Sequence, residues 1–209
     1  MMLVAGGKAL VGRERVDKDV GGFYIDRTEV SNEAYHGFAQ STGREDPTLG
    51  LPGSFPVVNV NYDDAGAFCV WAGKRLPTDL EWEKAARGAE GRVYPWGDQP
   101  RPDLVNIPDE NDSRALEAVE SNLKGASPYG AINLLGNVWE WVAKLERLED
   151  DDLREVVLDP PATLEERGYQ IRGGSYRQKV DLREAVWDFA VAPARLKRAD
   201  IGFRCARDL

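Results

Sequence analysis

The feature that most constrains the fold is a long segment, residues 94–137, that carries neither helical nor strand periodicity. It contains a Pro-Trp-Gly turn and is rich in Asp, Asn, Gly and Pro. Connections of this length without regular structure are uncommon inside compact domains. We therefore expect something other than secondary structure to order the segment, and a bound metal ion is the natural candidate.

The bulk composition indicates one folded domain of moderate size. The chain has 209 residues, of which 42% are hydrophobic and 30% charged, as in ordinary globular proteins. No apolar run approaches the roughly 20 residues that a membrane span requires. The first ten residues do not resemble a signal peptide. We expect a cytoplasmic protein without membrane contact.

Charge and cysteine content exclude several classes of protein. The net charge is −9, which argues against a non-specific nucleic-acid binder because phosphate contacts need a basic surface. The densest acidic stretch, 145–152, is typical of a solvated loop or helix end. Two cysteines and one histidine, His36, supply neither a disulfide-dense scaffold nor a multi-cysteine zinc site.

Three helices are predicted from capping residues and spacing. Ser31 caps the first, which runs to about Ala39. Asp63 or Asp64 opens the second, whose apolar residues recur at helical intervals. The third begins with the capping box of residues 78–81 and stops at Gly88.

Short strands are predicted on both sides of these helices. Residues 2–12 indicate a strand pair around a Gly-Gly turn, and residues 23–26 and 57–60 indicate single strands. Two late strands are expected at 170–174 and 201–206. We expect the last strand to lie inside the sheet, beside the N-terminal one.

Seven short motifs follow one another along the chain. They lie at residues 71–78, 81–83, 94–97, 129–130, 133–141, 172–176 and 202–205. In this order they resemble the signature of the sulfatase-modifying-factor family, which includes the formylglycine-generating enzyme. The resemblance covers essentially the whole chain. It implies one domain over residues 1–209, with a compact α+β fold, little regular secondary structure and a relation to the C-type lectin fold.

The resemblance implies a first calcium site in the run from Asn133 to Glu140. Family members bind calcium there through side-chain and backbone oxygens. The matching positions are the Asn133 and Glu140 side chains and the carbonyls of Gly136 and Val138. Calcium accepts six to eight oxygen ligands in flexible geometry. The alternative is that Asn133 and Glu140 only tie the loop together by hydrogen bonds.

A second family calcium site is implied after the Pro-Trp-Gly turn. Asn106 and Ile107 match its first half, and the acidic ligand would be Asp112 or Asp109, although the local spacing departs from the family pattern. A solvated acidic loop is the alternative.

The resemblance also places Cys69 and Cys205 close together, where secreted members form a disulfide. Such a bond would contribute about 4–5 kcal/mol in the chain-entropy description. In a reducing cytosol the two residues would remain a buried pair of thiols.

The chemistry of the family's enzyme is not expected here. That enzyme holds copper(I) with two thiolates, and the positions that the resemblance assigns to them are Gln178 and Arg183. Copper(I) selects soft sulfur ligands, so we expect no copper site and no formylglycine generation.

A ligand cleft is nevertheless implied. Trp139, Ser175 and Tyr176 match positions that line the substrate cleft of the family, and Gln178, Arg183 and Trp187 lie near them in sequence. Arg and Trp are favoured in binding hot spots. For Trp139 and Trp187 a core position is the alternative, and Trp141 is expected in the core.

The sequence therefore predicts a non-catalytic pseudoenzyme domain that recognises a peptide, a protein or a small ligand. Bacterial relatives often carry this domain beside signalling domains, which suggests a larger bacterial signalling protein. One alternative is an enzyme of altered, copper-independent chemistry that uses Asp181, Glu184 or Asp188. Others are a variable binding protein of a diversity-generating retroelement and a purely structural role in an assembly.

Overall fold

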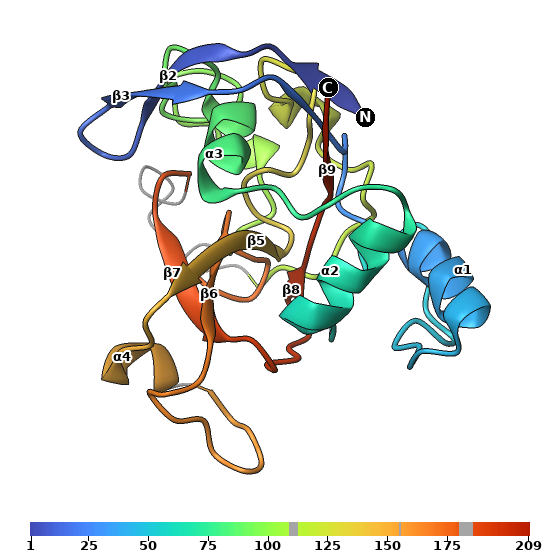
Figure 1. The fold of residues 1–209 in the computed structure, drawn as a ribbon. Helices are drawn as coiled ribbons and strands as arrows, with labels where there is room; N and C mark the ends of the chain where they lie inside the picture. The colour runs from blue at the N-terminus through green and yellow to red at the C-terminus, as the bar shows by residue number, and fades with distance from the viewer. Residues whose placement is uncertain (109–112, 155, 180–185) are drawn as a thin grey trace.

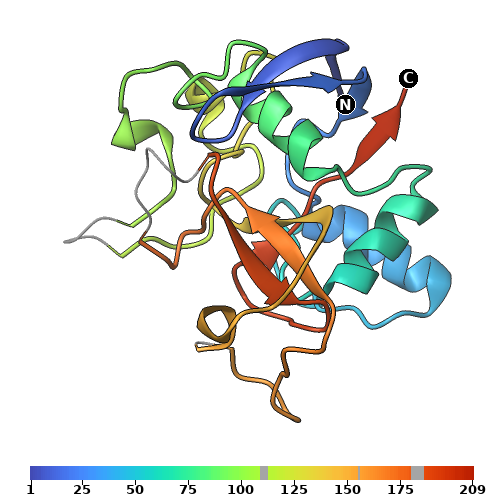
Figure 2. The ribbon, with the colours of Figure 1, turned by 60° about the vertical axis from the view of Figure 1, so that its left-hand side comes forward.

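A computed structural model of the chain describes residues 1–108, 113–154, 156–179 and 186–209. In Figures 1 and 2 a β-hairpin lies at one end of the molecule and a short helix, α4 (Asp150–Leu153), at the opposite end. Two helices, α1 and α2, lie together at one side.

The N-terminal residues form two separate sheets. Strand β1 (Met2–Val4) pairs with β4 (Phe23–Ile25), which also pairs with β9 (Ala206–Asp208), so the order is β1-β4-β9. Strand β2 (Gly7–Val11) pairs with β3 (Val16–Val20) in a hairpin. The predicted pair within residues 2–12 is therefore wrong, because the Gly-Gly step links two sheets instead of turning between two strands. The last strand lies beside β4 and not beside β1.

The three predicted helices are confirmed. Helix α1 (Asn32–Thr42) is capped by Ser31, whose Oγ accepts from the Ala34 amide. Helix α2 (Tyr62–Trp71) is capped by Asn61 and not by an aspartate. Helix α3 (Asp79–Arg87) starts with the full Thr78–Glu81 capping box and ends at Gly88.

A four-stranded sheet carries the second half of the chain, in the order β7-β6-β5-β8. Its members are β5 (Trp139–Glu146), β6 (Gly168–Arg172), β7 (Phe189–Pro193) and β8 (Ile201–Gly202). The predicted strand at 57–60 does not form. Val57, Val58 and Val60 are buried, but Asn59 is exposed and has a φ of 58°, which interrupts an extended strand.

The described part of segment 94–137 has little regular structure, as predicted. It contains two short 3-10 helices, η1 (Pro102–Leu104) and η2 (Leu123–Gly125). Backbone and side-chain amides hold it: the Asn137 amide donates to the Asn106 carbonyl at 2.9 Å, and the Ile132 amide donates to the Arg27 carbonyl at 2.8 Å. Asn133 and Asn137 adopt positive φ, which asparagine tolerates better than most residues.

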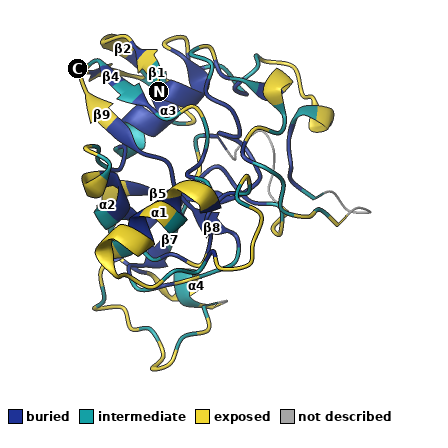
Figure 3. Ribbon diagram, turned by 90° about the vertical axis from the view of Figure 1, so that its right-hand side faces the viewer, coloured by how far each residue is buried: buried dark blue, intermediate teal, exposed yellow. Residues whose placement is uncertain are grey.

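Two apolar clusters form the core. One gathers around Trp82 and the N-terminal strands, and the other around the aromatic side chains of α1 and α2 and the second sheet. Helix α3 is almost entirely buried, whereas α1 and α2 each present an exposed face (Figure 3).

Cys69 of α2 and Cys205 form a disulfide with a Cα–Cα distance of 5.7 Å. The predicted proximity of the two cysteines is thus confirmed. Within the described residues, no helix is both long enough and apolar enough to cross a membrane.

Candidate functional site: a polar cluster and an adjoining cleft

A fully buried ion pair lies below the loop that precedes β5. Arg204 donates to both carboxylate oxygens of Glu140, with Nη2 at 2.6 Å from Oε1 and Nε at 2.7 Å from Oε2. The indole Nε1 of Trp82 donates to the same Oε2 at 2.7 Å. Burial is the largest single effect and lowers the pKa of Arg204, but the charge and hydrogen bonds of Glu140, together with the charges of Glu29 and Asp26, raise the pKa overall.

A second buried carboxylate, Glu29, joins this cluster. Its two oxygens accept from the side-chain amides of Asn137, at 2.8 Å, and Asn133, at 3.1 Å. Burial raises the pKa of Glu29 to about 7, although Arg204 opposes the change. No sequence motif that we considered pointed to Glu29, and its distance in sequence from Asn133 explains why.

The first calcium site can be tested against these contacts. Both oxygens of Glu140 already accept charge-assisted or indole hydrogen bonds, and the guanidinium of Arg204 supplies the positive charge beside them. Asn133 directs its amide nitrogen to Glu29 and to the Val119 carbonyl. In this arrangement Asn133 and Glu140 tie the loop by hydrogen bonds and do not fit an open calcium site with Gly136 and Val138.

Asn106 fits a calcium site better than Asn133 and Glu140 do. It is the one side-chain ligand of the second site that lies among the described residues. Asn106 donates from Nδ2 to the Ala115 carbonyl at 2.9 Å and to Asn137 Oδ1 at 3.1 Å. Those contacts fix the amide orientation and leave Asn106 Oδ1 buried without a hydrogen-bond partner. A buried acceptor in this state suits a hard cation. Ile107 is adjacent and buried, whereas Asp109 and Asp112 lie outside the described residues.

The second part of the candidate site begins at Gln178, which contacts Trp139. Trp139 is only 5% exposed, and its Nε1 donates to Gln178 Oε1 at 3.1 Å. Trp139 is thus a core residue whose polar edge reaches a cleft residue. Trp141 is fully buried and donates to the Val60 carbonyl, as its core prediction required.

Behind the cleft, Ser175 and Asp200 form a buried polar wall. Ser175 Oγ donates to Asp200 Oδ2 at 2.7 Å, and Arg198 Nε donates to Asp200 Oδ1 at 2.5 Å. Tyr176 is half-buried, and its hydroxyl donates to the Ala199 carbonyl at 3.4 Å. Burial raises the pKa of Tyr176, Arg177 opposes this and Asp200 adds to it.

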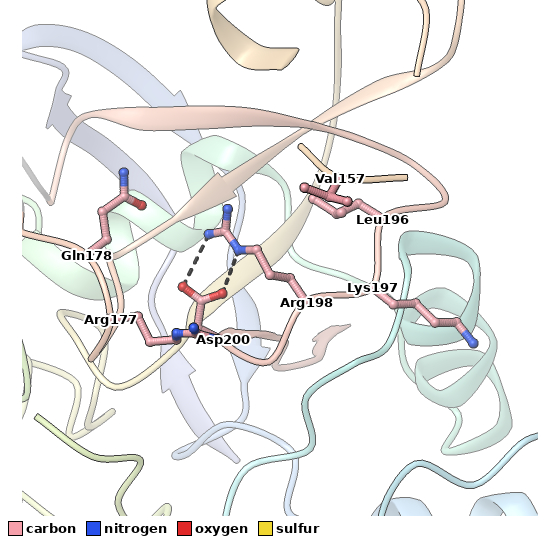
Figure 4. A pocket seen from close by; sticks show the side chains of 7 residues that line it. All are labelled: Val157, Arg177, Gln178, Leu196, Lys197, Arg198 and Asp200. Atoms are coloured by element: carbon pink, nitrogen blue, oxygen red, sulfur yellow. Dashed lines mark hydrogen bonds and ion pairs between the residues drawn. The ribbon is translucent and has the colours of Figure 1, made fainter. Parts of the chain in front are cut away.

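These residues open into a hollow of about 330 Å³ (Figure 4). Its lining comprises Val157, Arg177, Gln178, Leu196, Lys197, Arg198 and Asp200. Figure 4 shows Arg198 bridging to Asp200 in the middle, with Arg177 and Gln178 on one side and Val157 and Leu196 on the other. The Lys197 ammonium points away and pairs with Glu45 at 2.5 Å.

A second hollow of about 290 Å³ shares Gln178, Leu196 and Arg198 with the first. Asp151 and Asp152 of α4 line its far side, together with residues of β7. The two hollows adjoin at these shared residues, and we call them together the cleft. Its walls carry guanidinium groups near Asp200, carboxylates at α4 and apolar side chains between them.

The remaining predicted cleft residues are placed differently. Trp187 is half-buried and packs against the guanidinium of Arg87, 5.0 Å from its ring centroid. Asp188 is exposed and accepts from the Phe189 amide. Arg183, Asp181 and Glu184 lie outside the described residues.

Sequence reasoning missed Arg198 and Asp200 as cleft residues. They follow Ser175 by more than twenty positions and belong to no motif. The only available signal was the run of charged residues Lys197, Arg198 and Asp200 before the final strands, and any solvated surface loop could show such a run.

The fold and cleft define a class of protein. Within the described residues, two small sheets, a four-stranded sheet and four α-helices, with long loops between them, match the C-type-lectin-like α+β fold of formylglycine-generating enzymes. The solved structure of CarF superposes with a TM-score of 0.77 at 23% sequence identity, over 100% of this chain and 97% of that chain.

The sequence gives the family directly. The family model described as "Sulfatase-modifying factor enzyme 1-like domain" matches residues 1–209. The chain therefore belongs to this family. The inactive C-alpha-formylglycine-generating enzyme 2 of Bos taurus is 44% identical over 110 residues, which cover 48% of this chain and 36% of that protein.

Active relatives are also similar. The formylglycine-generating enzyme of Streptomyces coelicolor is 34% identical over 186 residues, or 79% of this chain and 56% of that enzyme. The matched part of this chain thus spans between about a third and a little over half of these two relatives. Because the family includes proteins named as enzymes and proteins named as inactive, membership alone does not decide catalysis.

Proposed function

We propose that this chain is a non-catalytic recognition domain whose cleft binds a peptide segment of another protein. The observation that carries the proposal is the state of its thiols. The chain contains two cysteines, and both are joined in the Cys69–Cys205 bond. No thiolate is left for the cleft.

The copper chemistry of the family's enzyme depends on those thiolates. Copper(I) favours soft sulfur ligands over amides and guanidinium groups. At the first thiolate position, as the resemblance assigns it, Gln178 holds a hydrogen bond to Trp139. Cys69 and Cys205 are fully buried in the core beside α2, and neither lines the cleft. A relative that is named inactive supports the same conclusion.

The lining of the cleft suits a peptide. Arg177 makes no ion pair with a described residue, so its guanidinium is available to a carboxylate or a backbone carbonyl. Gln178 uses its Oε1 for Trp139 and keeps its amide nitrogen as a donor. Leu196 and Val157 supply apolar surface, and Asp152 supplies an acceptor on the far side. A peptide presents backbone donors and acceptors together with charged and apolar side chains. These groups match the donors, the acceptor and the apolar surface of the cleft.

The test is a selection from a displayed random peptide library on the immobilised chain. The enriched peptide is synthesised, and its Kd is measured by calorimetry for wild type, Arg177→Ala and Gln178→Ala. Arg13→Ala is the matched control, because Arg13 lies exposed in the turn of the β2–β3 hairpin, at the end of the molecule opposite α4.

We expect either cleft substitution to weaken binding about tenfold or more while the control leaves the Kd unchanged. That change corresponds to about 1.4 kcal/mol and is modest for a binding hot spot. If the control weakens binding as much as the cleft variants do, or if no peptide is enriched, the cleft is not a peptide site.

A further inference from the structure

The charged end of the cleft contains two arginine side chains that line the same hollow. Arg177 and Arg198 both belong to the lining of the hollow of about 330 Å³. Of the described residues that line it, Asp200 is the only acidic one. Lys197 also belongs to the lining, but its ammonium pairs with Glu45. Two guanidinium charges therefore face one carboxylate, and one positive charge at this end of the cleft is not balanced.

A buried carboxylate holds Arg198 in place. The Nε of Arg198 donates to Asp200 Oδ1 at 2.5 Å, and its Nη2 donates to Asp200 Oδ2 at 3.3 Å. The side chain of Asp200 is only 4% exposed, whereas that of Arg198 is 33% exposed. Two donors on one planar group fix its orientation. Arg198 therefore has little conformational freedom left to lose when a ligand binds to it.

The remaining nitrogen of this guanidinium is open to solvent. Nη1 of Arg198 has no hydrogen-bond partner among the described residues, and it is not one of the buried polar atoms that lack a partner. Figure 4 shows this third nitrogen pointing away from Asp200. Because Arg198 lines both hollows of the cleft, a ligand that enters the cleft can reach this donor.

Ser175 connects the two arginines. Its Oγ donates to Asp200 Oδ2 at 2.7 Å and accepts from the backbone amide of Arg177 at 3.3 Å. Ser175 is fully buried. The backbone of Arg177 and the guanidinium of Arg198 are thus anchored to the same buried pair. The Arg177 side chain itself is exposed and forms no ion pair with a described residue.

The other side chains of the cleft determine what can lie next to these charges. Leu196 is buried, but Val157 is 92% exposed, and both line the hollow of the two arginines. Contact with an apolar side chain would remove part of the Val157 surface from water. Asp151 and Asp152 line the far side of the second hollow, and their negative charge disfavours an anion at that end.

We propose that the peptide bound by the cleft presents a carboxylate to Arg177 and Arg198 and places an apolar side chain beside it on Leu196 and Val157. The inference rests on the proposed function, because it names the class of peptide that the cleft selects. A carboxylate has two oxygens that accept N–H groups of guanidinium in charge-assisted hydrogen bonds. Its single charge balances the unpaired positive charge, which a backbone carbonyl cannot do. Asp200 acts as a positioning residue.

The test uses four short peptides, which are titrated into the whole chain and followed by amide chemical shifts. N-acetyl-Leu-Glu amide carries both proposed groups. N-acetyl-Leu-Gln amide removes the charge, and N-acetyl-Ser-Glu amide removes the apolar side chain. N-acetyl-Leu-Gln with a free carboxylate moves the charge to the chain terminus. We expect millimolar binding of the Leu-Glu peptide, with shifts centred on residues 175–178 and 196–200, and at least fivefold weaker binding of the Leu-Gln and Ser-Glu amides.

Two variants test the arginines separately. Arg177→Gln changes an exposed side chain and should reduce the preference for the Leu-Glu over the Leu-Gln amide to less than twofold. The double variant Arg198→Gln/Asp200→Asn should reduce it similarly, and it leaves no unpaired charge buried. Arg101→Gln is the matched control and should keep the full preference. Arg101 also donates twice to an aspartate two residues later, Asp103, but both side chains are exposed and neither lines the cleft.

The outcomes separate this inference from the proposed function. It is wrong if none of the four peptides causes localised shifts, if the Leu-Glu and Leu-Gln amides bind equally well, or if both variants keep the preference. If library peptides still bind the cleft in that case, the peptide function stands and only the selection for a carboxylate fails. If no library peptide binds either, both fail. Tighter binding of the free-carboxylate peptide than of the Leu-Glu amide would assign the site to a chain terminus, and weaker binding would assign it to an acidic side chain.

Discussion

Reduction of the Cys69–Cys205 bond gives a sharp test of what holds the two halves of the chain together. The bond closes a loop with a sequence separation of 136 residues. In the chain-entropy description, a loop of this length restricts the unfolded chain by about 5 kcal/mol at 25 °C. Residual structure in the unfolded state reduces the measured effect, so we expect a loss of about 3–5 kcal/mol.

The assay is urea unfolding followed by tryptophan fluorescence and circular dichroism, with and without a phosphine reductant. The double variant Cys69→Ala/Cys205→Ala is the control, because its unfolding should not respond to the reductant. Its own stability should lie close to that of the reduced wild type, lowered further by the volume lost in the core.

The denaturant dependence provides a second, independent quantity. A reduced chain unfolds to a more extended ensemble and exposes more surface, so its m-value should rise. A stability loss below about 1 kcal/mol, or an m-value that does not change on reduction, would refute the argument that the bond acts on the unfolded chain.

Three further outcomes are expected. Arg204→Met should lower the free energy of unfolding by about 3–5 kcal/mol in urea titrations, because it leaves Glu140 buried without its charge partner. Adding Glu140→Gln to this variant should recover part of the lost stability. No recovery would contradict the ion-pair explanation. If calcium binds at Asn106, a chelator should lower the Tm of the wild type in scanning calorimetry and should not lower that of Asn106→Ala, whereas an unchanged wild-type Tm in a preparation that began with calcium would remove that site. Incubation with copper and a Cys-x-Pro-x-Arg peptide should give no aldehyde by mass spectrometry, and aldehyde formation would overturn the non-catalytic proposal.

The parts of the fold that sequence predicted correctly depend on neighbours in the chain. Ser31 caps α1 through an amide three residues away, and Thr78 and Glu81 close the capping box of α3 across the same interval. Such contacts are encoded within one helical turn, so their pattern is visible without any knowledge of the tertiary structure.

The missed strands depend on pairing and burial that their own residue patterns do not indicate. Strand β3 was not predicted because residues 17–19 are charged, exposed and without an apolar face, and only its pairing with β2 makes them a strand. Strand β5 was not predicted for another reason. Glu140 interrupts the apolar pattern of the strand, and the burial of Glu140 depends on its ion pair with Arg204. An acidic residue in that position indicates exposure until its partner is known.

The candidate site likewise contains residues that motifs indicated and residues that depend on contacts between distant segments. The resemblance led us to expect Trp139, Ser175 and Tyr176 in the lining of the cleft. None of the three lines either hollow, although Trp139 contacts Gln178 and Ser175 contacts Asp200. The charged wall formed by Arg198 and Asp200 could not be inferred, because it forms only when the loop before β8 folds back against Ser175. Glu29 was missed because its contacts with Asn133 and Asn137 join segments about a hundred residues apart.

The central position of β4 in the β1-β4-β9 sheet has a consequence for biosynthesis. One edge of β4 pairs with β1, which the ribosome makes earlier, but the other edge pairs with residues 206–208. Until those residues are translated, β4 presents open backbone donors and acceptors, and Cys69 lacks its partner. Nascent chains that end before residue 205 should therefore expose a strand edge able to pair with other chains.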